Sequence, residues 1–225
     1  GFMNAYFLTG DDRYLESWRK QTARVNAAKR TIDGRVMYPR MFGDKGWYGW
    51  VPQPYSYNQL EIYYLSMKTQ DRRFLENDPW LKYLDGNNPG YPEQALRADL
   101  AEVRQRAIAM DTDTTTPDTR LADDPAQFNP ARVAALRQTM TAGLDPGRRA
   151  SIWHCRLRYF DPSRRRAGIP EDCAALIDRM TDDTTRVTLV NTNQLAPREL
   201  IVQAGAYAEH TIKSVRRDGK STLVD

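Results

Sequence analysis

The chain contains the stretch Thr9-Gly10-Asp11-Asp12-Arg13-Tyr14-Leu15-Glu16, and sixty positions later it contains Thr69-Gln70-Asp71-Arg72-Arg73-Phe74-Leu75-Glu76. Five of the eight positions are identical, and the sixth keeps an aromatic ring. Each copy follows an aromatic-rich apolar run, as expected where one helix ends, the chain turns and the next helix begins. The recurrence therefore predicts stacked helical hairpins. Since about three or more such units are usually needed to cover their apolar faces, it also indicates an array that is incomplete within this stretch.

The spacing of apolar residues changes along the chain from a helical period to alternation. Three- and four-residue steps predict amphipathic helices over residues 11–29, 57–68, 92–110 and 130–140. Glycines and prolines indicate a long structured loop over residues 33–57. Alternation predicts strands over 151–160, 186–190, 198–203, 207–212 and 221–224, and one more short helix is expected over 171–180. The predicted fold class is therefore α+β, with a helical-hairpin region over residues 1–145 and a small antiparallel β-rich domain, expected to be truncated, over 146–225.

The charges of the chain are nearly balanced and are interleaved. Its 225 residues include 33 basic and 29 acidic side chains, with a net charge of +4 and a pI of about 9.1. A duplex-binding protein usually gathers its Lys and Arg on one face or helix, so this distribution argues against nucleic acid as a partner. No apolar run approaches the ~20 residues that span a bilayer, so we expect no membrane partner.

Motifs that hold metals or cofactors are missing from the sequence. It has no HExxH, no CxxC, no GxGxxG and no phosphate-binding loop, so neither a metal nor a cofactor is expected. The Asp-rich stretch that starts at Asp111 has Thr116 where a calcium loop requires glycine, and is interpreted as a surface connector. Cys155 and Cys173 form either two reduced thiols or one disulfide. The isolated pair favours the first, and the compartment stays open.

The best functional candidate is the loop over residues 43–58, which holds five aromatic residues between positions 47 and 57. Aromatic faces stack on the C–H-rich faces of sugar rings, and nearby polar groups can bond hydroxyls or carboxylates. The predicted substrate-binding residues are Lys45, Trp47, Tyr48, Trp50, Gln53 and Asn58. The alternative is structural, because Trp47, Trp50 and Tyr55 can instead fill the base of a loop that has no other core.

Signals for catalysis are weaker, and the predicted catalytic residues are Asp44, Tyr55 and Tyr57. A glycosidase needs two carboxyl groups ~5–10 Å apart, and Asp44 could pair with Asp11, Asp12 or Glu61. A lyase needs a base and a cation, which Tyr55 or Tyr57 with Lys45 or Arg40 could supply. Each carboxylate is equally open to interpretation as a helix cap or a surface charge.

The repeated Thr-x-Asp-x-Arg-(Tyr/Phe)-Leu-Glu phrase resembles the helical hairpins of (α/α) toroid proteins. The stretches Val187-Thr188-Leu189-Val190-Asn191 and Val202–His210 are similar to the C-terminal β-domain of uncharacterised bacterial proteins with that layout. This resemblance implies a carbohydrate-active protein, either a polysaccharide lyase or a glycoside hydrolase, acting on a polysaccharide or oligosaccharide, acidic ones included. By analogy it favours a periplasmic or secreted location.

Two further interpretations stay open at this stage. The chain can be a non-catalytic structural or binding portion that packs against the rest of a larger protein. It can also bind an acidic polymer through Arg156, Arg158 and Arg164–Arg166. His154 is expected on one strand face with Arg156 and Arg158, either as a cationic row that holds an anionic group or as a solvated face, and the solvated face is favoured.

Overall fold

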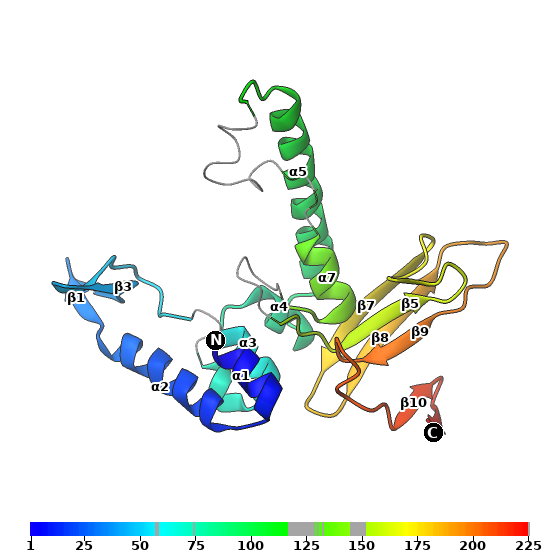
Figure 1. Cartoon of the computed structure of the whole chain (residues 1–225), viewed down its shortest axis with the longest axis horizontal. Helices are drawn as coiled ribbons and strands as arrows, with labels where there is room; N and C mark the ends of the chain where they lie inside the picture. The colour runs from blue at the N-terminus through cyan, green and yellow to red at the C-terminus, as the bar shows by residue number, and fades with distance from the viewer. Residues whose placement is uncertain are drawn as a thin grey trace. The chain divides into compact units, whose positions relative to one another are not determined.

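The computed structural model describes residues 1–56, 59–73, 75–116, 129, 131, 133–144 and 152–224. It contains helices and small antiparallel sheets, which confirms the α+β class (Figure 1). Contacts divide the chain into two compact units. Unit 1 comprises Gly1–Asp85, Pro146–Ile152 and Thr181–Thr184, and unit 2 comprises Gly86–Asp145, Trp153–Met180 and Thr185–Asp225. The sequence-based boundary at 145/146 rests on the change of period and stays a prediction. No helix in the described ranges has the length and apolar character that crossing a membrane requires.

The first copy of the repeated phrase forms a turn between two helices, as predicted. Helix α1 (Phe2–Thr9) ends at Gly10, whose φ of 65° is a left-handed conformation that glycine adopts without strain. Helix α2 (Arg13–Ala27) begins three residues later. Its apolar spacing predicts an inward stripe, of which Leu15, Trp18, Thr22 and Val25 are buried and Tyr14 is half-buried. A small apolar core joins the two helices to α3 (Gln59–Ser66) through Met3, Leu15, Trp18 and Ile62.

The second copy has a different local structure from the first. Helix α3 is followed by a short 3-10 turn, η1 (Thr69–Arg72), and the next α-helix, α4 (Pro79–Leu84), begins only after Asp78 caps it. The reason is the position of Asp71, which is 2% exposed. Its carboxylate accepts hydrogen bonds from Arg19 Nε at 2.9 Å, Arg19 Nη2 at 2.8 Å and Ser66 Oγ at 2.5 Å. Gln59 Nε2 donates to the Asp71 carbonyl at 2.8 Å.

We call Arg19, Gln59, Ser66 and Asp71 the polar node. It connects α2, α3 and η1 around one enclosed carboxylate. The hydrogen bonds to Asp71 are the largest cause that raises the pKa of Arg19, since they stabilise its charged form. The tertiary partner of Asp71, which is not visible in the repeated phrase itself, therefore determines the local structure of the second copy.

The long structured loop predicted over residues 33–57 contains strands that are not predicted from the sequence. Two hairpins are formed: β1 (Arg30–Ile32) with β2 (Arg35–Met37), and β3 (Met41–Gly43) with β4 (Gly46–Tyr48). The two-residue turn Asp33-Gly34 has φ values of 50° and 73°, as a type I′ turn requires, and this turn matches the twist of paired strands.

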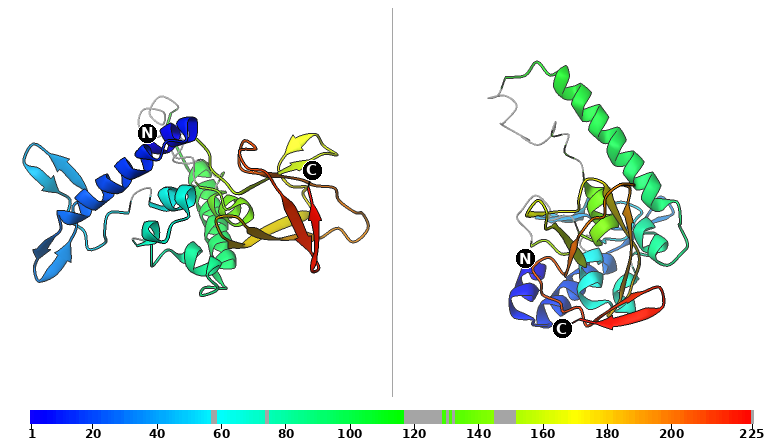
Figure 2. Two further views of the ribbon diagram at one scale, coloured as in Figure 1. Left: turned by 90° about the horizontal axis from the view of Figure 1, so that it is seen from below. Right: turned by 90° about the vertical axis from the view of Figure 1, so that its right-hand side faces the viewer.

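Unit 2 combines two helices with short antiparallel sheets. Helix α5 (Tyr91–Asp111) has no buried residue, and α7 (Ala134–Thr141) packs against it and against β7 (Cys173–Met180). One sheet has the order β6 (Arg166–Ala167), β5 (Leu157–Asp161), β9 (Ile201–Ala204), and β7 pairs with β8 (Thr185–Asn191). A third pair is formed by β10 (Ser214–Arg217) and β11 (Lys220–Leu223) (Figure 2).

Three predictions in this part are corrected by the structure. The helix expected over 171–180 is strand β7, because pairing with β8 and the alternating burial of Ala175 and Ile177 outweigh a short apolar spacing that fits both structures. The strand expected over 151–160 starts only at Leu157. The strand expected over 207–212 is absent. The Glu209 carboxylate instead accepts hydrogen bonds from the backbone N–H groups of Ala206 and Tyr207. Both cysteines are free thiols.

Candidate functional site

The β3–β4 pair is the centre of a longer hairpin. Met41 faces Tyr48, Phe42 faces Trp47, and an isolated bridge joins Tyr38 and Val51 in the same register. We call residues 38–51 the aromatic hairpin. Because neighbouring residues of a strand point to opposite sides, Phe42 and Trp47 lie on one side, and Met41 and Tyr48 on the other.

Aromatic rings are exposed on both sides of the aromatic hairpin. The Phe42 and Trp47 rings meet edge to face with centroids 4.8 Å apart, and Phe42 is 68% exposed. On the other side Tyr48 is 51% exposed, and a Cβ placed on Gly43 would lie 3.2 Å from its ring. The two sides of a two-stranded hairpin cannot both pack against one core, so the rings on at least one side remain accessible. The local contacts given above hold these rings in position.

Trp50 differs from the exposed rings in its burial and in its contacts. It is half-buried, and the Arg30 guanidinium lies 5.0 Å from its ring centroid, a cation–π contact. This contact joins the first strand of the β1–β2 hairpin to the end of the aromatic hairpin. Trp50 therefore contributes to the local structure of the predicted binding segment.

The residues after the aromatic hairpin are attached to α2 through the backbone. The Asn26 side chain accepts from Tyr55 N at 2.7 Å and donates to Tyr55 O at 2.8 Å, and Arg40 Nη2 donates to Gln53 O at 3.1 Å. Tyr57 and Asn58, predicted for catalysis and binding, lie outside the described residues.

Of the predicted catalytic residues, Asp44 and Tyr55 lie in the described part of the chain, and the structure does not bring these two together. Asp44 and Lys45 form the exposed turn of the aromatic hairpin, whereas Tyr55 lies beside α2. Extended chain from Tyr38 to Asp44 spans roughly 20 Å, which separates the turn from the end that is attached to α2. Asp33 and Asp44 are the two carboxylates of residues 30–55, and they lie in different turns. Asp11, a suggested partner of Asp44, instead accepts hydrogen bonds from the backbone and side chain of Arg13.

Glu61, another suggested partner of Asp44, lies on α3. It is half-buried, and the loss of hydration raises the pKa of its carboxyl group. A raised pKa is a property of general acids, but it also arises wherever a carboxylate is packed against apolar groups. Within the described residues no group of three or more His, Cys, Asp or Glu side chains has the arrangement of a metal site.

Cations of the two hairpins are not matched by carboxylates. In the described parts of the chain no ion pair involves Lys29, Arg30, Arg35, Arg40 or Lys45. Arginines in other elements do have carboxylate partners, such as Arg19 with Asp71 and Arg72 with Asp85. The two hairpins therefore combine exposed rings with positive charge.

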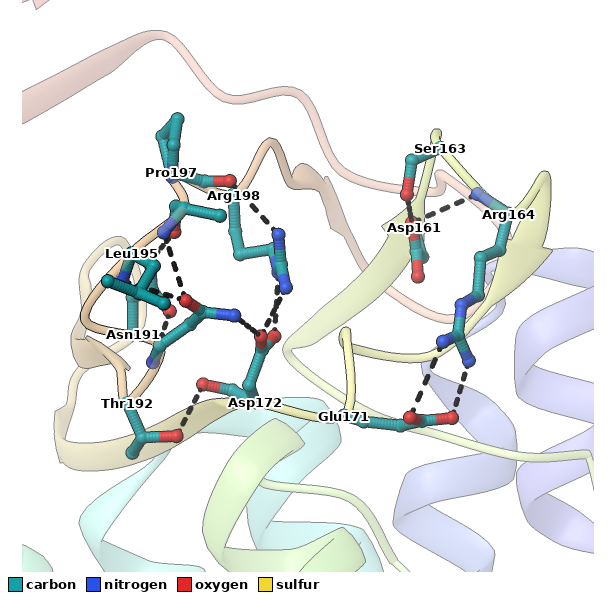
Figure 3. A network of polar contacts seen from close by, with 12 residues as sticks. Asp161, Ser163, Arg164, Glu171, Asp172, Asn191, Thr192, Leu195, Pro197 and Arg198 are labelled. Atoms are coloured by element: carbon teal, nitrogen blue, oxygen red, sulfur yellow. Dashed lines mark hydrogen bonds and ion pairs between the residues drawn. The ribbon is translucent and has the colours of Figure 1, made fainter.

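Polar side chains also gather in unit 2, where they bond one another (Figure 3). Arg198 donates two hydrogen bonds to Asp172, which also accepts from Asn193, and Arg164 pairs with Glu171. The pKa of Asp172 is lowered, chiefly by Arg198 and then by Asn193. The side-chain oxygen of Asn193 in turn accepts hydrogen bonds from the backbone N–H groups of residues 195 and 196. These contacts fix the loop after β8 and leave its charges paired, so we assign them a structural role.

The expected cationic row on a solvated strand face is not formed. His154 is buried, which corrects the prediction, and burial lowers its pKa to about 4. Arg158 donates to the Ala206 carbonyl, and its guanidinium lies 4.9 Å from the Phe160 ring centroid. Arg164 is paired with Glu171.

Comparison with known proteins concerns a different part of the chain. Residues 75–137 match a domain of unknown function, DUF8034. This match covers less than a third of the chain; it includes α4 and α5 and begins after both hairpins. No curated protein and no solved structure matches the chain. The comparisons therefore assign no activity.

Sequence reasoning missed Phe42, the most exposed aromatic ring of the site. Its signal was present: Met41-Phe42 and Trp47-Tyr48 are placed symmetrically around Gly43-Asp44-Lys45-Gly46, a pattern typical of a hairpin with a glycine-containing turn. Glycines are also typical of loops, so the pattern alone does not distinguish a hairpin from a loop.

Proposed function

We propose that the aromatic hairpin binds a carbohydrate, with Phe42 and Tyr48 as its stacking surfaces. The observation that carries this proposal is the exposure of both rings on a hairpin whose local contacts hold them in position. A ring held in one orientation loses little conformational freedom when a ligand stacks on it. Asp44 and Lys45 in the adjoining turn supply hydrogen-bonding groups for hydroxyls.

The finer proposal concerns activity and fold class. We propose that α1 and α2 form one hairpin of an (α/α) toroid in a polysaccharide lyase or glycoside hydrolase. It is supported by the tight turn at Gly10 and by Leu8, an exposed apolar residue near the end of α1 that a neighbouring hairpin would cover. Assays for new reducing ends and for unsaturated products separate hydrolysis from elimination. A protein that retains a glycan and cleaves none would limit the function to binding.

Affinity-gel retardation across a panel of neutral and acidic glycans tests the binding proposal. We expect at least one glycan to retard the protein, and the Phe42→Ala/Tyr48→Ala variant to lose that retardation. The matched control is Val215→Ala/Leu223→Ala, which removes two side chains of another hairpin that are 50% and 80% exposed. The proposal fails if both variants and the unsubstituted protein migrate alike on every glycan gel.

A second function is favoured by α5. This 21-residue helix has no buried residue, and Leu100 and Ile108 are more than half exposed. We therefore propose, as the alternative, a non-catalytic portion in which α5 packs against other parts of a larger protein. Amide hydrogen exchange tests it, because α5 should exchange rapidly in this chain and become protected in a longer one.

A further inference from the structure

Strand β8 presents one unpaired edge. In the described residues it pairs with β7 alone, as part of a two-stranded sheet. Thr192 N donates to Asp172 O at 2.8 Å, so the pair formed by these two residues is hydrogen-bonded. Narrow and wide pairs alternate in an antiparallel ladder, which makes Ala175–Leu189 and Ile177–Val187 non-hydrogen-bonded pairs. The backbone N–H and C=O groups of Val187 and Leu189 therefore point away from β7, toward the open edge.

The β7–β8 ladder has a bulge between Ile177 and Arg179, and the extra residue lies on β7, so the open edge of β8 itself lacks the features that usually prevent pairing between chains. Natural edge strands are short, or they carry prolines, bulges or charges that face outward. The β8 sequence Thr-Arg-Val-Thr-Leu-Val-Asn is seven residues long, rich in β-branched side chains and free of proline. Its single charge, Arg186, is paired with Asp178 at 2.5 Å. Leu189 and Val190, on opposite faces of the strand, are each about half exposed.

We propose that β8 pairs antiparallel with β8 of a second copy of this chain, about a two-fold axis at Thr188. In this register Val187 of one copy faces Leu189 of the other through the outward backbone groups, and apolar side chains meet apolar side chains. Arg186 faces Val190 of the other copy, so no two like charges are opposed. The pairing is isologous, because the same segment serves both copies.

The register determines which cysteine substitutions can cross-link. Thr188 faces its own copy at a non-hydrogen-bonded position, where Cα atoms lie about 4.5 Å apart. That separation is compatible with a disulfide. Val190 lies two residues from the axis, so the two copies of this residue are roughly 13 Å apart. In a Cys173→Ser background, Thr188→Cys should form a covalent dimer under mild oxidation, and Val190→Cys should not.

Sedimentation equilibrium of the full chain gives the second readout. We expect a reversible dimer for the unsubstituted protein and a monomer for Val187→Pro. Proline at this position removes an outward N–H only and leaves the ladder with β7 intact. If Val187→Pro loses its native circular dichroism, Thr188→Lys replaces it, because it sets two lysines opposite each other at the axis. A protein that stays monomeric at high micromolar concentration, or equal cross-linking at positions 188 and 190, would overturn the proposal.

Discussion

Unit 1 contains two regions that differ in whether their charged side chains are enclosed and paired. In the polar node, Asp71 is enclosed and accepts from Arg19 and Ser66. In the two hairpins, Phe42 and Tyr48 are exposed, and no ion pair in the described residues involves Arg30, Arg35, Arg40 or Lys45. Where the chain satisfies its own polar groups it builds the scaffold. Where it leaves rings and charges accessible it can bind a ligand.

This comparison predicts that substitutions in the polar node change stability, whereas substitutions in the aromatic hairpin change binding. The largest effect is expected for Asp71→Asn, which leaves the mostly enclosed Arg19 with the exposed Glu16 as its remaining carboxylate partner. We expect the free energy of unfolding to fall by about 3 kcal/mol. Urea unfolding followed by circular dichroism measures it.

The matched control for Asp71 is Asp85→Asn, which breaks the more exposed ion pair with Arg72. Its cost should stay below about 1 kcal/mol. Equal costs for the two variants would contradict the assignment of Asp71 to the scaffold.

Unit 2 extends the comparison to pH, because His154 is an enclosed titratable group. Its pKa is lowered from 6.5 to about 4, first by burial and then by the charge of Arg156. The unfolded chain takes up this proton near pH 6.5, whereas the folded chain does so only near pH 4. Stability is therefore complete above pH 6.5 and falls as the pH drops to 4, by about 3 kcal/mol.

Urea unfolding between pH 7 and pH 4 tests the role of His154. The His154→Gln variant should lose much of this pH dependence, whereas replacement of the exposed His210 by Gln should leave it unchanged. A pH dependence that survives in His154→Gln would show that other groups cause it.

A smaller effect is expected at Asp11, which occupies the position in the first copy that Asp71 occupies in the second. Asp11 is partly exposed and accepts from Arg13 N at 2.9 Å and from Arg13 Nε at 2.8 Å. Asp11→Ala removes the side-chain hydrogen bonds to Arg13 at the start of α2, so we expect a loss of stability in thermal or urea unfolding that is smaller than that of Asp71→Asn. A loss as large as that of Asp71→Asn would show that the two copies are equivalent.

The smallest effect is expected at Gly43. An added Cβ would lie 3.2 Å from the Tyr48 ring, which can move by a few tenths of an ångström. We expect Gly43→Ala to change the free energy of unfolding by no more than about 0.5 kcal/mol. Its effect on glycan retardation should be intermediate between no change and the loss caused by Phe42→Ala/Tyr48→Ala. Full loss of retardation would show that the position of Tyr48 matters more than its exposure.

Much of the helical fold was predictable from local pattern. The turn at Gly10 and the buried stripe of α2 follow from spacing and capping, because both are decided within a few residues. The 171–180 segment was not predictable, since its short apolar run fits helix and strand, and β8 decides between them. The local structure of the second copy of the phrase was not predictable for the same reason, because Arg19, the partner of Asp71, lies 52 residues away on α2.

The candidate site was predictable in composition but not in arrangement. The cluster of aromatic residues was evident, but Trp50 is engaged by Arg30 and Phe42 was overlooked. Register decides which rings share a side, and it depends on the turn at Gly43–Gly46, whose glycines fit a hairpin turn and a longer loop equally well.

Isothermal titration calorimetry with a glycan that retards the protein tests the central claim most directly. The Phe42→Ala/Tyr48→Ala variant should bind at least about tenfold more weakly, a change of about 1.4 kcal/mol, and keep its unfolding transition. Asp71→Asn, measured where it is folded, should bind as the unsubstituted protein does. Unchanged affinity in the double variant would contradict the assignment of binding to the aromatic hairpin.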